Sequence, residues 1–184
     1  MYKIAVLVGS LRRDSINRKL AQALSNLSKS KFAFQYLELG DVPMYNEDLW
    51  ANPPPSVLKL KSDVVAADGV LIVTPEYNRG LPPVVKNAID WANRPYGQNS
   101  WAGKPTALAG ASPGAVGTAA AQAQLRSMAA PLGMAVLGQP ELYFSFKPGL
   151  IDDAGNVTDA STKSFLEKYL ASFETWIKAV QQGR

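Results

Sequence analysis

Residues 9–18 place hydrogen-bond donors at the point where an apolar, strand-like run gives way to a helical pattern. Two serine hydroxyls, an arginine guanidinium and an asparagine amide can all donate to phosphate oxygens. They belong to Ser10, Ser15, Arg12 and Asn17. The start of a helix adds unpaired backbone N–H groups and the positive end of the helix dipole. The segment is therefore predicted to bind a phosphate group.

The glycine content of this loop indicates which kind of phosphate it binds. No Gly-Lys-Ser or Gly-Lys-Thr follows, so the loop is not a Walker A motif, and Gly9 alone cannot make the three-glycine dinucleotide fingerprint. With one glycine, side chains stand between the backbone and the ligand. This arrangement favours a terminal monophosphate over a pyrophosphate, and FMN is one nucleotide that ends in such a group.

The composition narrows the chemistry that the chain can perform. None of the 184 residues is Cys or His, which excludes thiolate nucleophiles and the commonest general base and zinc ligand. Redox chemistry would therefore need a cofactor. The net charge of +4 is modest, and no block of Lys and Arg is long enough to indicate nucleic-acid binding.

The hydropathy pattern gives an expectation about location. No apolar run reaches 18 residues, and no secretory leader pattern precedes the first strand-like run. We therefore expect no membrane association and a cytoplasmic protein.

Strand-like and helical patterns alternate along the whole chain. Buried-strand patterns fall at residues 4–8, 32–39, 69–74, 105–110 and 134–138, and helical periodicity at 16–27, 57–67, 82–92, 118–130 and 165–180. Five such units predict an α/β fold, a flavodoxin-like doubly wound five-stranded parallel sheet of order 2-1-3-4-5. We expect one such domain over residues 1–184. Ligands of these folds bind beyond the carboxyl ends of strands 1 and 3.

Two further loops reach the same edge of the predicted sheet. Residues 75–82 combine polar residues with rigid prolines after the third strand, which favours a rim for a flat heterocycle over a mere connection. Residues 111–117 follow the fourth strand and are small, which allows either close approach to a ligand or tight helix packing.

Together these segments resemble the NADPH-dependent FMN reductase family, in particular its chromate and quinone reductase branch. The matching motifs are Gly9-Ser10-Leu11-Arg12 with Ser15 and Asn17, Pro75-Glu76-Tyr77-Asn78 with Lys86 to Trp91, Gly103-Lys104-Pro105, and Gly110 to Gly114 with Gly117. The chain departs from the usual family pattern at Gly80, where Ser is common, and at Pro83, where Gly is common.

The resemblance implies non-covalent FMN and a set of cofactor-binding residues. The phosphate would bind Ser10, Arg12, Ser15 and Asn17 together with the backbone around Leu11 and Ile16. The edge of the isoalloxazine ring would meet Pro75, Glu76, Tyr77 and Asn78. The polar end of the ring would meet Ser112, Pro113 and Gly114.

The resemblance also implies an activity. NADPH or NADH would reduce FMN, and the cofactor would then reduce a quinone, chromate or similar small acceptor in a ping-pong sequence without a catalytic side chain. Arg13 and Arg79 could attract the phosphates of the nicotinamide nucleotide, or could simply be exposed.

The family resemblance further implies a homodimer or homotetramer. We expect Trp91 or Trp101 at or near an interface between copies, with packing in the core as the alternative for Trp91.

Two other function classes fit parts of the pattern. A flavodoxin-type electron carrier would share the fold and FMN but lack its own NAD(P)H oxidase activity; such carriers are usually acidic, unlike this chain. A phospho-acceptor regulatory domain would need an Asp at the end of the third strand, where this chain has Val73, Thr74 and Pro75.

Overall fold

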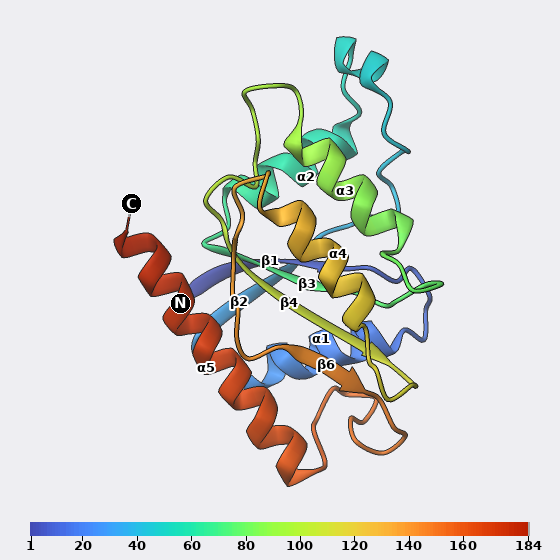
Figure 1. The fold of residues 1–184 in the computed structure, drawn as a ribbon, viewed down its shortest axis with the longest axis vertical. Helices are drawn as coiled ribbons and strands as arrows, with labels where there is room; N and C mark the ends of the chain where they lie inside the picture. Colours follow the sequence, from blue (N-terminus) through green and yellow to red (C-terminus); the bar gives the residue numbers. More distant parts are fainter. Residues whose placement is uncertain (184) are drawn as a thin grey trace.

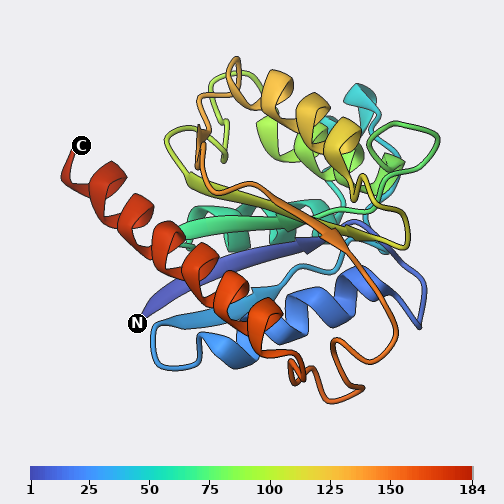
Figure 2. The same cartoon turned by 60° about the horizontal axis from the view of Figure 1, so that its bottom comes forward.

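The computed structural model describes residues 1–183 as a parallel sheet covered by helices on both faces (Figures 1 and 2). The strands are β1 (Tyr2–Val8), β2 (Phe32–Tyr36), β3 (Gly69–Val73), β4 (Pro105–Ser112), β5 (Ala135–Val136) and β6 (Leu142–Ser145). The helices are α1 (Ile16–Leu27), α2 (Pro55–Val65), α3 (Pro83–Asn93), α4 (Ala119–Ala129) and α5 (Ala160–Gln182), with a 3-10 turn, η1, at Glu47–Ala51.

The strand order confirms the flavodoxin-like prediction. The order is β2-β1-β3-β4-β5, and every pairing is parallel. The order reverses beside β1, so the loops after β1 and β3 leave the same edge of the sheet on neighbouring strands. The predicted switch point is therefore present.

The fifth position of the sheet differs from the prediction of one strand over residues 134–138. The short β5 pairs only with the start of β4, at Pro105 and Thr106. The chain then leaves the sheet at Gln139 and Pro140 and returns as β6, which pairs with the second half of β4. Pro140 has no N–H to donate to a ladder, which explains why pairing stops before it. Similarly, the strand predicted over 32–39 ends at Tyr36.

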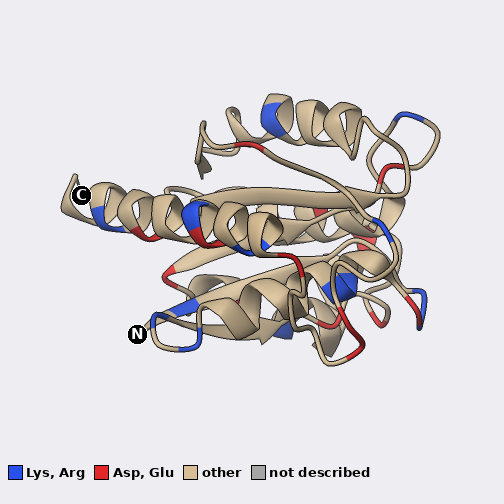
Figure 3. Cartoon of the chain, turned by 90° about the horizontal axis from the view of Figure 1, so that it is seen from below, with Lys and Arg blue, Asp and Glu red and all other residues tan. Residues whose placement is uncertain are grey.

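Alternate residues of β1 point into two separate cores. Ile4 and Val6 pack with α1 and α5, whereas Ala5 and Leu7 pack with α2, α3 and α4 on the other face. This alternation is the expected geometry of a strand buried on both faces. The charged residues lie mainly on the helices and loops around these cores (Figure 3). None of the helices within residues 1–183 is both long and apolar enough to cross a membrane.

Trp91 and Trp101 lie inside the second core. Both side chains are 0% exposed, and their indole N–H groups donate to the carbonyls of Pro43 and Ile89. The core alternative for Trp91 is therefore confirmed. Neither side chain reaches the surface, so neither can itself contact another copy of the chain. That one of them lies near an interface between copies stays a prediction.

Local capping fixes where the helices near the carboxyl edge begin. Ser15 is the N-cap of α1, and its hydroxyl oxygen accepts the N–H of Arg18 at 3.2 Å. Pro83 occupies the first turn of α3, where its missing N–H costs nothing. Both helices thus start beside the loops that are predicted to contact a ligand.

Candidate functional site

A cavity of about 240 Å³ lies at the carboxyl edge, between the loops that follow β1, β3 and β4. Most of the predicted site residues line it. They are Ser10, Arg12, Ser15, Ile16, Asn17, Pro75, Glu76, Tyr77, Ser112 and Pro113. Asp14 and Ala111 also line the cavity and were missed, because an acidic side chain and a strand alanine carry no signal for phosphate binding.

Three predicted residues lie outside the cavity lining. Leu11 is 61% exposed and lines a neighbouring hollow, Asn78 sits at the exposed tip of the second loop, and Gly114 is exposed in the third loop. The structure therefore brings the three loops together while leaving these positions at the rim.

The first loop presents unpaired donors to the cavity. The side chain of Ser10 is buried, yet its hydroxyl has no hydrogen-bond partner among residues 1–183. In the same part of the chain, no acceptor takes up the N–H groups of Ile16 and Asn17 in the first turn of α1. Arg12 is exposed and makes no ion pair with any described residue. These donors line the cavity and have no protein acceptor, so they are available to an anionic ligand at the start of the helix.

Asn17 uses its side chain differently from the prediction. Its amide nitrogen donates to the carbonyl of Ala111 at 3.0 Å, and its amide oxygen accepts the N–H of Ala111 at 2.8 Å. The side chain is only 2% exposed. Asn17 thus joins the start of α1 to the end of β4, and its backbone N–H is the group left for a ligand.

The second loop forms a two-residue β-hairpin turn. Tyr77 and Gly80 exchange backbone hydrogen bonds of 3.0 and 2.9 Å, and the two residues between them have positive φ angles of 52° for Asn78 and 61° for Arg79. These are the features of a type I′ turn. The N–H groups of both turn residues have no acceptor within residues 1–183, so they remain available at the rim.

The Glu76 carboxylate caps the N-terminus of helix α4. One carboxylate oxygen accepts the N–H groups of Ala120 and Ala121 at 2.9 and 3.2 Å, and the other accepts from Arg79 at 3.3 Å. The side chain of Thr118, the N-cap residue of α4, makes no capping hydrogen bond. The capping acceptor is instead Glu76, which is 44 residues away from Ala120 in the sequence. A carboxylate at a helix N-terminus is favoured by the helix dipole.

The third loop is held close to β6. Gly117 has a φ of 63°, and a Cβ there would lie 2.8 Å from the backbone of Tyr143. Ser112 turns its hydroxyl to the carbonyl of Gly114 at 3.3 Å. The loop therefore curls over the cavity with Ser112 and Pro113 facing it.

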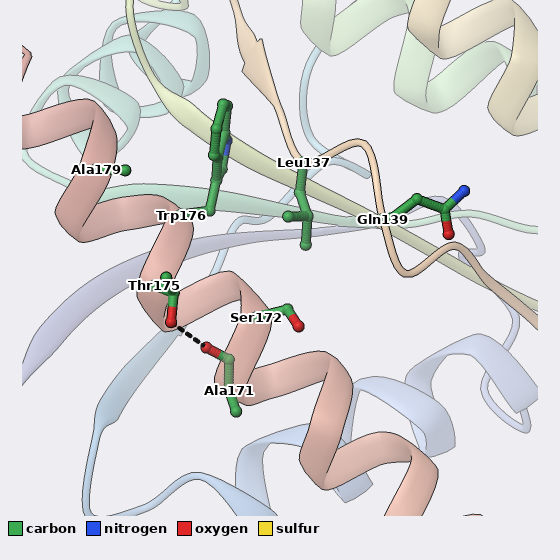
Figure 4. A pocket seen from close by; sticks show the side chains of 7 residues that line it. All are labelled: Leu137, Gln139, Ala171, Ser172, Thr175, Trp176 and Ala179. Atoms are coloured by element: carbon green, nitrogen blue, oxygen red, sulfur yellow. Dashed lines mark hydrogen bonds between the residues drawn. The ribbon is translucent and has the colours of Figure 1, made fainter.

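Two other hollows differ from this cavity in lining and place. One, of about 480 Å³, adjoins the cavity, shares Arg12 and Tyr77 with it, and is otherwise lined by Gly9, Leu11, Pro82, Pro83 and Val84. The other, of about 410 Å³, lies between α5 and the segment after β5, and no charged side chain lines it (Figure 4). Because β5 pairs with the amino end of β4, the second hollow lies away from the carboxyl edge.

Comparison with known proteins decides the family. The model of a family described as NADPH-dependent FMN reductase matches residues 2–149. The chain belongs to this NADPH-dependent FMN reductase family. It is 46% identical to a 2-hydroxy-1,4-benzoquinone reductase of Burkholderia over 96% of each chain, and 45% identical to a quinone reductase of Pseudomonas putida over 97% of this chain and 96% of that one.

A solved structure agrees with the fold. FerB from Paracoccus denitrificans, a flavoenzyme NAD(P)H:(acceptor) oxidoreductase, is 47% identical to this chain. It superposes with a TM-score of 0.95 over 97% of this chain and 98% of that one. The protein is thus an NAD(P)H-dependent oxidoreductase of the FMN reductase family, with FMN as its cofactor. The unpaired donors of the first loop fit the phosphate of such a cofactor.

The pairing of Asn17 with Ala111 yields a test of the site's framework. We expect Asn17→Ala to lower the free energy of unfolding by about 2 to 3 kcal/mol, because two hydrogen bonds are lost and the polar groups of Ala111 stay buried. Chemical denaturation of the apoprotein measures the change.

Asn26→Ala is the matched control on the same helix. Asn26 donates to the exposed carbonyl of Ala154 at 2.9 Å and to the part-buried carbonyl of Gly155 at 3.0 Å. Water can reach this site more easily than the buried Ala111 pair, so a smaller loss of about 1 kcal/mol is expected. Equal losses in the two variants would contradict a special role for Asn17.

Proposed function

We propose that this protein oxidises NADPH or NADH and reduces a quinone, chromate or similar small acceptor in a ping-pong sequence. Its relatives at 46% and 45% identity are named as reductases of 2-hydroxy-1,4-benzoquinone and of quinones, which supports this class of acceptor. The observation that carries the proposal is the single cavity in which three loops combine unpaired anion donors with a rim of Pro75 and Tyr77.

We assign the FMN phosphate to the first loop, within one FMN-binding domain. The Ser10 hydroxyl, the Arg12 guanidinium and the N–H groups at the start of α1 would donate to its oxygens. Ser15 can add its hydroxyl proton, because its oxygen is the acceptor in the helix cap. The further members of this assignment are Leu11 and Ile16 through the backbone, and Asn17 through its N–H.

We assign the isoalloxazine ring to the second and third loops. Pro75 and Tyr77 would contact its edge, with Glu76 and Asn78 contributing backbone groups because the Glu76 carboxylate is already occupied. Ser112, Pro113 and Gly114 would meet its polar end.

The protein's contribution to the reaction is placement. When bound, FMN supplies the hydride chemistry between nicotinamide and acceptor. The chain holds no Cys or His, so no thiolate or imidazole of this chain takes part in the reaction. The loops instead fix the cofactor and leave Tyr77, 45% exposed, at the mouth where substrates enter.

An anaerobic visible spectrum of the purified protein before and after NADPH addition tests the function. We expect a yellow protein that bleaches at once. If the protein is yellow but neither NADPH nor NADH bleaches it, the electron-carrier function replaces this proposal. A colourless protein that does not bind added FMN would overturn the cofactor assignment.

Arg12→Ala tests the phosphate assignment. Loss of one charge-assisted hydrogen bond should weaken FMN binding by about 2 kcal/mol, measured by titration of the apoprotein. Arg13→Ala is the control, because Arg13 is the adjacent exposed arginine and does not line the cavity. Unchanged affinity in Arg12→Ala would show that the phosphate binds elsewhere.

We further propose that the protein is a homodimer or homotetramer in the cytoplasm. The exposed Leu11, with Pro83 and Val84 around the hollow of about 480 Å³, forms an apolar surface suited to contact with a second copy. Light scattering after size-exclusion chromatography should give at least twice the monomer mass. Elution as a monomer at micromolar concentration would contradict the assembly.

A further inference from the structure

We propose that Gln124 of α4 is a positioning residue that holds the 77–80 hairpin in the shape that the FMN ring requires. The inference rests on the proposed function, since the hairpin is the proposed contact for the ring edge. Gln124 itself does not line the cavity, so any effect on the cofactor must pass through the hairpin.

The hairpin turn holds Arg79 in a backbone conformation that is unfavourable for a residue with a side chain. A type I′ turn needs positive φ at both central positions and prefers Asn followed by Gly. Asn78 satisfies the first position, but Arg79 holds a φ of 61° at the second, where a side chain with Cβ is strained. Such strain persists only where surrounding contacts enforce it.

Gln124 supplies such contacts from outside the cavity. Its amide oxygen accepts the N–H of Leu81 at 2.9 Å, and its amide nitrogen donates to the carbonyl of Arg79 at 3.4 Å. One side chain thus holds the backbone on both sides of Gly80. Arg79 is the strained residue, so the hydrogen bond from Gln124 to its carbonyl directly restrains the orientation of the Arg79 backbone.

Helix α4 holds the hairpin at a second point. The Glu76 carboxylate, 7% exposed, accepts two N–H groups from the first turn of α4, one turn before Gln124. The residue before the hairpin and the residue after it are therefore both tied to one rigid helix. Of the two residues that tie the hairpin to α4, Gln124 is exposed and does not line the cavity. It can therefore be substituted without removing a proposed cofactor contact.

Gln124→Ala in the full chain is the direct test. We expect FMN to bind the apoprotein about tenfold more weakly, because losing both bonds removes the restraint on the turn. We also expect a shifted midpoint potential and an altered visible circular dichroism spectrum of bound FMN, which a purely structural role would leave unchanged. The melting temperature of the apoprotein should fall by no more than about 4 °C, because two exposed hydrogen bonds contribute about 1 kcal/mol to the folded chain.

Gln22→Ala is the matched control. Gln22 is an exposed glutamine on α1 whose amide nitrogen donates to the side chain of Asn26, so its loss should change neither affinity nor potential.

Arg79→Gly provides a second, independent arm. Glycine removes the left-handed strain and creates the preferred Asn-Gly turn, so the hairpin should keep its shape without Gln124. The affinity loss caused by Gln124→Ala should then shrink to about threefold or less in the Arg79→Gly background. An equal loss in both backgrounds would overturn the strain argument.

The outcomes separate this inference from the proposed function. If wild-type protein binds FMN and is bleached by NAD(P)H, but Gln124→Ala retains affinity, potential and spectrum, the inference is wrong and the function stands. If wild-type protein itself fails to bind FMN, the proposed function fails, and the inference falls with it.

Discussion

The paired hydrogen bonds between the Asn17 side chain and the backbone of Ala111 are the constraint on which the rest of the site depends. They join the first turn of α1 to the end of β4 across 94 residues of sequence, at 2.8 and 3.0 Å. A parallel sheet aligns its strands but leaves the loops at its carboxyl edge without partners. Asn17 connects two of these loops, because its hydrogen bonds to Ala111 fix the first loop relative to the third.

Two other amide side chains repeat this arrangement around the same edge. Asn87 of α3 accepts the N–H of Tyr45 at 2.8 Å and donates to the carbonyl of Pro43 at 2.9 Å, and Gln124 bridges Arg79 and Leu81. An amide carries both a donor and an acceptor, so it can pair with a backbone as a neighbouring strand would. Three helices are thereby tied to the end of β4 and to two irregular segments, and the contacts of Asn17 and Gln124 hold the surroundings of the proposed cofactor cavity in place.

The parts of the structure that follow from local pattern were predictable, and those that depend on distant partners were not. The apolar periodicity of β1, β3 and α1 reflects burial on both faces of the sheet or on one face of the helix, so their positions and the strand order could be derived. The division of the fifth strand position into β5 and β6 could not be derived. It depends on the length of β4, which extends beyond the short β5 and pairs with β6 there.

The same distinction applies to side chains at the site. The residue types of the first loop indicate an anion, and the donors of Ser10 and Arg12 indeed line the cavity. The pairing of Asn17 with Ala111 and the capping of α4 by Glu76 join residues 94 and 44 positions apart. No local pattern reports such contacts, and the same side chains would serve equally well as direct ligands. The burial of Trp101 escaped prediction for the same reason, since the segment around it reads as an exposed loop.

Gly9 and Gly80 differ in whether the surrounding structure leaves room for a side chain. A Cβ at Gly9 would lie 2.7 Å from Cγ2 of the buried Val85 and 3.0 Å from Pro75, so the loops after β1 and β3 can touch only because Gly9 has no side chain. A Cβ at Gly80 would lie 3.4 Å from the nearest atom, the carbonyl oxygen of Tyr77, which is ordinary contact. The backbone therefore requires glycine at position 9 but not at position 80. The departure from the family's common Ser at position 80 thus changes the surface beside the cavity mouth rather than the framework that holds the cofactor.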